Sequence, residues 1–180
     1  MTKSKKSIPM QNNRVLGVDP GFDRIGMAIL EKPARPDDSG HSGGDQVLYS
    51  HCLQTNRQEP HHQRLLNIGQ EIRKVIIKWK PTSLAIESLF FNQNSTNALK
   101  VSEARGVIIY EATRAGLEIF EYGPQAIKIA VTGYGKADKI QMETMVRKLI
   151  ILPSKTLKRL DDEMDAIAIG ITHLAYTRNK

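Results

Sequence analysis

Four acidic residues stand beside apolar stretches of the chain, where a carboxylate is out of place. Asp19 and Glu87 each end a short apolar run, and Asp162 and Asp165 open a longer one. Residues spaced i and i+3 share one face of a helix, so the last two side chains point the same way. Carboxylates brought together repel one another unless a cation joins them, and oxygen ligands favour Mg²⁺ or Mn²⁺.

Such a cluster would suit the hydrolysis of a phosphodiester. Two metal ions about 4 Å apart can activate a water molecule and stabilise the leaving oxygen. Mg²⁺ keeps several water ligands and takes others from a phosphate substrate. The cluster therefore predicts a nuclease-type metal site, provided that the fold brings the four acids together.

Each acid alone also has an ordinary explanation. Asp19 lies in Asp-Pro-Gly, a common turn sequence, and Glu87 at a strand end fits a solvated or ion-paired residue. Asp162 and Asp165 fit the first turn of a helix, where acids interact favourably with the helix dipole. The case for a metal site depends on all four acids meeting at one place.

Apolar periodicity predicts the elements that must position these acids. The strands are expected at 14–18, 24–31, 46–54, 83–87 and 117–122, and the helices at 65–79, 95–115, 124–131, 142–152 and 161–176. A three-strand meander followed by β–α alternation is typical of an α/β fold. The prediction is a five-stranded mixed β-sheet with helices on both faces.

Individual residues mark several helix ends. Gly116 is expected to stop the second helix, and Asp138 with Gln141 forms a capping box before the fourth. Asp161 and Glu163 fall off the face that carries the paired aspartates, and both are predicted to be solvated.

The length of 180 residues suits a single domain, expected over 14–178. Residues 1–13 are interpreted as a disordered basic tail, and 33–45 as a flexible hairpin loop. The single cysteine, Cys52, excludes an intramolecular disulfide. No apolar run reaches the roughly 18 residues of a membrane helix, and no secretory signal is recognised, so a cytoplasmic protein without membrane contact is expected.

The charge is unevenly distributed along the chain. The net charge is +7, and residues 61–160 carry sixteen basic against eight acidic residues. If the four site acids bind metal, the rest of the chain has 26 basic against 15 acidic residues. This balance favours a nucleic-acid backbone as the partner.

Four segments of the chain have a distinctive sequence. They read Val-Leu-Gly-Val-Asp-Pro-Gly-Phe at 15–22, Leu-Ala-Ile-Glu-Ser-Leu-Phe-Phe at 84–91, Ala-Leu-Lys-Val-Ser-Glu-Ala-Arg-Gly at 98–106, and Asp-Glu-Met-Asp-Ala-Ile-Ala-Ile-Gly-Ile-Thr-His at 162–173. Together they resemble the RuvC Holliday-junction resolvases. The resemblance extends from about residue 14 to about residue 176. It implies an RNase H-like fold.

The resemblance also implies an activity and its cofactor. Enzymes of this family are homodimeric endonucleases that nick two opposed strands of a four-way DNA junction, leaving 5′-phosphate and 3′-hydroxyl ends for recombination and repair. The acidic positions of the family fall on Asp19, Glu87, Asp162 and Asp165. These four residues are thus the expected catalytic metal ligands for two Mg²⁺ ions, which Mn²⁺ could replace.

The same resemblance suggests which residues meet the DNA. Basic side chains of the family near the scissile phosphate or the backbone align with Lys128 and with Lys139, which also joins the catalytic set. The full expected DNA-binding set is Phe90, Phe91, Arg105, Lys128, Lys136 and Lys139. An aromatic residue at the position of Phe90 is implied to stack on bases near the junction centre. His173 is interpreted as a packed helix residue rather than a ligand.

Three other functions are compatible with parts of the pattern. They are another RNase H-like nuclease acting on RNA or a different branched substrate, a sugar-kinase-like or actin-like ATPase, and a junction-binding protein without catalysis. An ATPase needs further glycine-rich phosphate loops, and four intact acids near DNA disfavour a mere binder. The family alone implies a branch-migration complex of the RuvA–RuvB type as partner and a bacterial, nucleoid-associated location.

Overall fold

The computed structural model describes residues 13–32, 44–89, 95–154 and 160–177. Almost all of the predicted basic tail and most of the predicted hairpin loop fall outside these ranges. Phe90 and Phe91, two of the expected DNA contacts, also lie outside the described residues.

The five predicted strands form a single mixed sheet in the order β3-β2-β1-β4-β5. They are β1 (Arg14–Asp19), β2 (Arg24–Glu31), β3 (Gln46–Gln54), β4 (Ser83–Glu87) and β5 (Glu118–Tyr122). The first three strands pair antiparallel as a meander, and β4 and β5 continue the sheet parallel to β1. The prediction of a five-stranded mixed sheet is confirmed.

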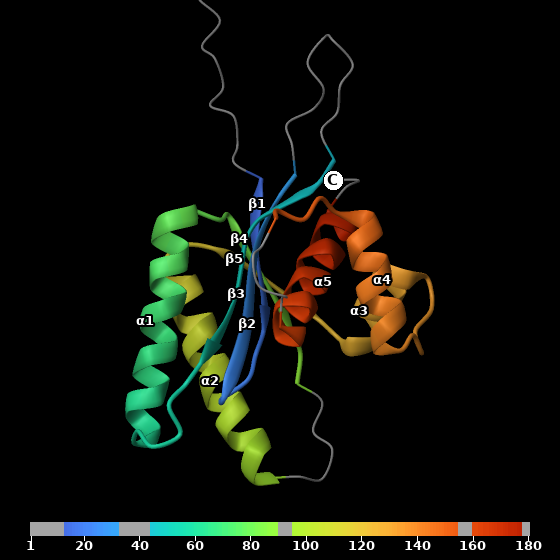
Figure 1. Cartoon of the computed structure of the whole chain (residues 1–180). Helices are drawn as coiled ribbons and strands as arrows, with labels where there is room; N and C mark the ends of the chain where they lie inside the picture. The colour runs from blue at the N-terminus through green and yellow to red at the C-terminus, as the bar shows by residue number, and fades with distance from the viewer. Residues whose placement is uncertain (1–12, 33–43, 90–94, 155–159, 178–180) are drawn as a thin grey trace, which may run out of the picture.

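Five helices cover the sheet. They are α1 (His61–Trp79), α2 (Ser95–Arg114), α3 (Pro124–Thr132), α4 (Lys139–Leu149) and α5 (Asp161–Tyr176). Figure 1 shows α1 and α2 on one face and α3, α4 and α5 on the other, as expected. Each face has its own apolar core, because successive strand residues point to opposite sides.

Three helix boundaries differ from the prediction by three residues or more. The first helix begins at His61 rather than Leu65, because its first turn contains no apolar residue. In α4 the expected capping box is present, but it opens the helix at Lys139, three residues earlier than predicted. The same helix ends at Leu149 rather than at the predicted Leu152, because Ile151 already lies beside β3, where its carbonyl accepts a hydrogen bond of 3.0 Å from the Val47 N–H.

Two strand glycines let α5 lie directly on the sheet. A Cβ atom at Gly26 would stand 1.8 Å from the carbonyl oxygen of Asp162, and one at Gly17 would stand 2.3 Å from that of Ala166. No side chain fits such contacts, so the start of α5 is held against β2 and the following turn against β1. This close approach fixes where the two helix aspartates lie.

The prediction that Glu163 is solvated is wrong. The residue is 3% exposed, and its carboxylate accepts a 2.7 Å hydrogen bond from the Ser50 hydroxyl of β3. The side chain of Asp161 is 64% exposed, as predicted, and pairs with Lys139 at 3.0 Å. Glu163 is buried while Asp161 is exposed because β3 passes beneath the first turn of α5. Ser50 and Glu163, which meet there, are 113 positions apart in the chain.

Among the described residues, no helix combines the length and the apolar composition that crossing a lipid bilayer requires.

Candidate active site

Two of the predicted acids end neighbouring parallel strands. Val18 of β1 is in register with Ile86 of β4, so Asp19 and Glu87, the next residue of each strand, come side by side. Val18 and Ile86 belong to the core under α1 and α2. The alternation of side chains then directs both carboxylates to the opposite face, where α5 lies.

The helix supplies the other two acids to the same edge of the sheet. Asp162 packs its backbone on Gly26, the residue that pairs with Asp19 across β1 and β2. Asp165 precedes Ala166, whose carbonyl rests against Gly17, two residues before Asp19. The fold therefore gathers all four predicted acids at the carboxyl ends of β1 and β4.

The pKa of Asp19 reflects the proximity of the other three acids. Its pKa is raised from 3.8 to about 7, first by burial and then by repulsion from Asp165, Glu87 and Asp162, in that order. The positive charge of Lys139 lowers the pKa of Asp19, but by less than the other causes raise it. A buried carboxylate facing three others needs additional positive charge to stay ionised at neutral pH.

Glu87 and Asp165 show the same tendency. Burial raises the pKa of Glu87, and the charge of Asp165 raises it further. Burial also raises the pKa of Asp165; Lys139 lowers it, and Asp162 and Asp161 raise it. The excess negative charge is thus a property of the cluster rather than of one residue.

Asp162 is the acid whose carboxylate is already paired. Its Oδ2 accepts a hydrogen bond from the Arg24 guanidinium, and the thiol of Cys52 lies 3.7 Å from the same oxygen. Within the four described ranges, no three His, Cys, Asp or Glu side chains converge closely enough to hold a metal ion as they stand.

The donor set nevertheless fits a hard divalent cation. All four side chains offer only carboxylate oxygens, which Mg²⁺ and Mn²⁺ prefer. The raised pKa of Asp19 identifies charge that such a cation would neutralise. The four side chains can therefore supply the oxygen ligands that a divalent metal requires.

A pocket of about 300 Å³ opens beside the acids, between α3, α4 and α5. Glu87 and Asp165 line one part of it, and Lys128 and Lys139 line another. Two predicted DNA-contacting lysines are thus within the same hollow as two predicted metal ligands. Anionic oxygens of a substrate would meet positive charge there.

The remaining basic candidates differ in their surroundings. Lys136 is exposed on the segment between α3 and α4. Arg105 of α2 has a side chain only 17% exposed, which pairs with Glu121 and donates to the backbone carbonyl of Glu87 at 3.2 Å. In this position Arg105 supports the strand end that carries Glu87.

The sequence interpretation missed Arg64, which fixes the turn after Asp19. Arg64 is 7% exposed, donates to Thr55 Oγ1 at 2.9 Å and pairs with Asp23. Its guanidinium also stands 3.9 Å from the centre of the Phe22 ring. The available signal was helical spacing, since Arg64 precedes Ile68 by four residues and so shares the apolar face of α1.

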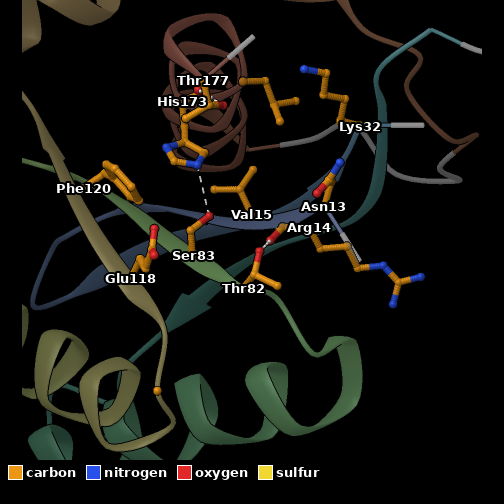
Figure 2. A pocket seen from close by; sticks show the side chains of 12 residues that line it. Asn13, Arg14, Val15, Lys32, Thr82, Ser83, Glu118, Phe120, His173 and Thr177 are labelled. Atoms are coloured by element: carbon orange, nitrogen blue, oxygen red, sulfur yellow. Dashed lines mark hydrogen bonds between the residues drawn. The ribbon is translucent and has the colours of Figure 1, made fainter. Parts of the chain in front are cut away.

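A different pocket, of about 420 Å³, lies at the opposite end of the parallel strands (Figure 2). Figure 2 shows the His173 ring of α5 above Ser83, with which it shares a hydrogen bond of 3.1 Å. The second ring nitrogen is 3.0 Å from the Tyr122 hydroxyl. His173 is 6% exposed, so it is a packed helix residue, as interpreted from the sequence.

The burial of His173 predicts a pH-dependent stability. Its pKa is lowered from 6.5 to about 4, so the unfolded chain binds more protons between these values and stability falls as the pH falls. Between pH 7 and 4.5 the wild type should lose about 2–3 kcal/mol more than His173→Gln. Urea unfolding of both proteins at the two pH values measures this difference. Equal losses would contradict the assignment of a buried neutral imidazole.

The chain is similar to proteins of known family. The family described as crossover junction endodeoxyribonuclease RuvC matches residues 15–173. A crossover junction endodeoxyribonuclease RuvC of Chloroflexus aurantiacus is 42% identical over 164 residues, which cover 91% of this chain and 93% of that protein. The protein of the same name from Desulfitobacterium hafniense is 39% identical, covering 88% of this chain and 90% of its own length.

Solved structures show the same similarity. Thermus thermophilus RuvC aligns with a TM-score of 0.79 at 30% identity, covering 92% of this chain and 96% of that one. T. thermophilus RuvC in complex with a Holliday junction substrate gives a TM-score of 0.80, covering 93% and 96%. The sheet and helices described above are therefore of the RNase H-like type that these proteins share.

Proposed function

The chain belongs to the RuvC family of crossover junction endodeoxyribonucleases, and we propose that it resolves four-way DNA junctions by paired nicks in two opposed strands. Asp19, Glu87, Asp162 and Asp165 hold the divalent metal in this proposal. The observation that carries it is the meeting of Asp19 of β1 with Glu87 of β4 and with the two aspartates of α5, whose charges help to raise the pKa of Asp19. A cluster of this kind has little structural purpose without a cation.

Membership of the family indicates dependence on a divalent metal, and Mg²⁺ in two-ion form is the proposed cofactor. When bound, it supplies an activated water and charge stabilisation of the leaving oxygen. The residues of the chain fix the site: β1 and β4 present Asp19 and Glu87, and the first five residues of α5 include Asp162 and Asp165. Lys128 and Lys139 orient the phosphate from the adjoining pocket. The products then carry 5′-phosphate and 3′-hydroxyl ends.

The proposed enzyme acts as an assembly of two copies of the chain. A homodimer would present two equivalent sites to opposed strands, which accounts for paired nicking. The proposal also includes coupling to a branch-migration complex of the RuvA–RuvB type. It further includes a cytoplasmic, nucleoid-associated role in recombination and repair, and membership of the family with its bacterial members supports both. Phe90, Phe91, Lys136 and Arg105 complete the proposed DNA-binding set.

The test is cleavage of a synthetic mobile four-way junction in Mg²⁺. Linear duplex and an RNA–DNA hybrid serve as control substrates, and light scattering of the purified protein gives its oligomeric state. We expect symmetric nicks in the junction that a DNA ligase reseals, and no cutting of the controls. Cleavage of the hybrid but not of the junction would overturn the assigned substrate, and a monomer would overturn the paired mechanism.

Lys139→Ala is expected to slow junction cleavage about 10²-fold. The Lys139 ammonium is 3.0 Å from Asp161 and also interacts with Asp165 and Asp162, so it stands at the edge of the carboxylate cluster. Its loss removes a charge that can face the transferred phosphate. Single-turnover cleavage measures the effect, and Lys74→Ala, on the opposite face of the sheet, is the matched control. Equal rates for both variants would exclude Lys139 from the site.

A further inference from the structure

An arginine outside the predicted site pairs with one of its acids. Arg24 is the first residue of β2, and its guanidinium forms an ion pair with Asp162 Oδ2 in the first turn of α5. The two residues are 138 positions apart in the chain. Their side chains are 45% and 23% exposed, so both remain accessible to solvent.

The backbone keeps this pair in place. Gly26 stands two residues after Arg24 and touches the Asp162 carbonyl, so α5 cannot shift along β2 without a clash. Cys52 of β3 pairs with Gly26 across the sheet and puts its sulfur 3.7 Å from the same Oδ2. The Asp162 carboxylate is therefore held over β2 and β3 by two side chains that are not metal ligands in the proposed function.

The other three acids lack such a partner among the described contacts. The charge of Lys139 interacts with the acidic cluster, but its ammonium forms a hydrogen-bonded ion pair with Asp161.

We propose that Arg24 is a positioning residue of the metal site, which holds Asp162 by an ion pair until a divalent cation takes its place. The inference rests on the proposed function, since Asp162 is a metal ligand only there. Binding of the cation then separates Arg24 from Asp162 and completes the carboxylate cluster. Arg24 thus sets the metal concentration at which the site fills.

Arg24 and the divalent cation then compete for the Asp162 carboxylate, and this competition can be measured. An ion pair exposed to this extent opposes the cation by a factor of about two to five. Replacing Arg24 with glutamine removes the competitor and leaves a side chain of similar length. The DNA-free variant should therefore bind the cation more tightly than the wild type.

The experiment is a titration of Mn²⁺ into the full-length, DNA-free protein, with free Mn²⁺ followed by its electron paramagnetic resonance signal. We expect a two- to fivefold lower Kd for Arg24→Gln and a value within twofold of wild type for Arg24→Lys, which keeps the charge. Arg57→Gln is the matched control, because Arg57 pairs with Asp23 at 2.8 Å and touches no proposed ligand. Its Kd should not change.

The outcomes distinguish a failure of the role assigned to Arg24 from a failure of the proposed metal site. Unchanged or weaker binding by Arg24→Gln would overturn the role of Arg24, and so would equal tightening by Arg57→Gln, which would indicate a general charge effect. Asp19→Asn, titrated alongside, should lose most of its Mn²⁺ binding. If it does not, the proposed metal site fails, whatever the arginine variants show.

Discussion

Asp19→Asn is expected to lower junction cleavage at least about 10³-fold while junction binding stays intact. Asp19 is the buried acid on which the charges of the other three converge, so it is the ligand whose loss most weakens the proposed metal site. The asparagine side chain keeps the shape, and the basic surface is unchanged. Single-turnover cleavage in Mg²⁺ and a gel-shift assay in EDTA measure the two properties separately.

The same substitution is expected to stabilise the metal-free protein. Because the pKa of Asp19 rises from 3.8 to about 7, the folded state binds more protons than the unfolded chain between these values. The ionised side chain therefore costs stability as the pH rises through this window. At pH 7.5 the variant should gain on the order of 4 kcal/mol, and the gain should vanish below pH 4.

Urea unfolding with EDTA and with Mg²⁺ tests this second effect. Mg²⁺ should stabilise the wild type and leave Asp19→Asn almost unchanged, because a ligand stabilises only the state that binds it. Glu118→Gln, an acid-to-amide change at the other end of the parallel strands, should follow the wild type in every condition. A variant that cleaves junctions normally would show that Asp19 is not a metal ligand.

The strands were predictable because each carries its own apolar pattern. The helix interiors were predictable from their apolar periodicity, but some helix ends were not. The first turn of α1 contains no apolar residue, so periodicity detects the helix only from Leu65 onward, although it begins at His61. The α4 start was recognised in the capping box of Asp138 and Gln141, yet apolar spacing alone moved it to Met142.

The candidate acids were predictable because each interrupts an apolar run, but their partners were not. Asp162 meets Arg24, and Glu163 meets Ser50, through contacts between residues more than 100 positions apart. Nothing near either acid in sequence indicates the partner. A glycine within an apolar strand was the one local signal, since Gly26 marks the place where another backbone comes close.

Gly26→Ala is expected to destabilise the protein by about 3 kcal/mol and to impair cleavage as well. The new Cβ would stand 1.8 Å from the Asp162 carbonyl oxygen and 2.5 Å from its carbonyl carbon, which are backbone atoms that no rotamer change can move. Relief requires α5 to lift from β2 at its first turn. That movement displaces Asp162 from Asp19, the residue opposite Gly26 in β1.

A second glycine gives the matched control for this prediction. Gly106 lies inside α2, and a Cβ there meets nothing within 4 Å. Gly106→Ala should therefore gain about 0.5–1 kcal/mol from helix propensity and keep full cleavage. Urea unfolding and single-turnover cleavage of the two variants compare a glycine required for close approach with one that is not. Equal stability of the two variants would mean that α5 does not rest on β2 at Gly26, and the position assigned to Asp162 would then be wrong.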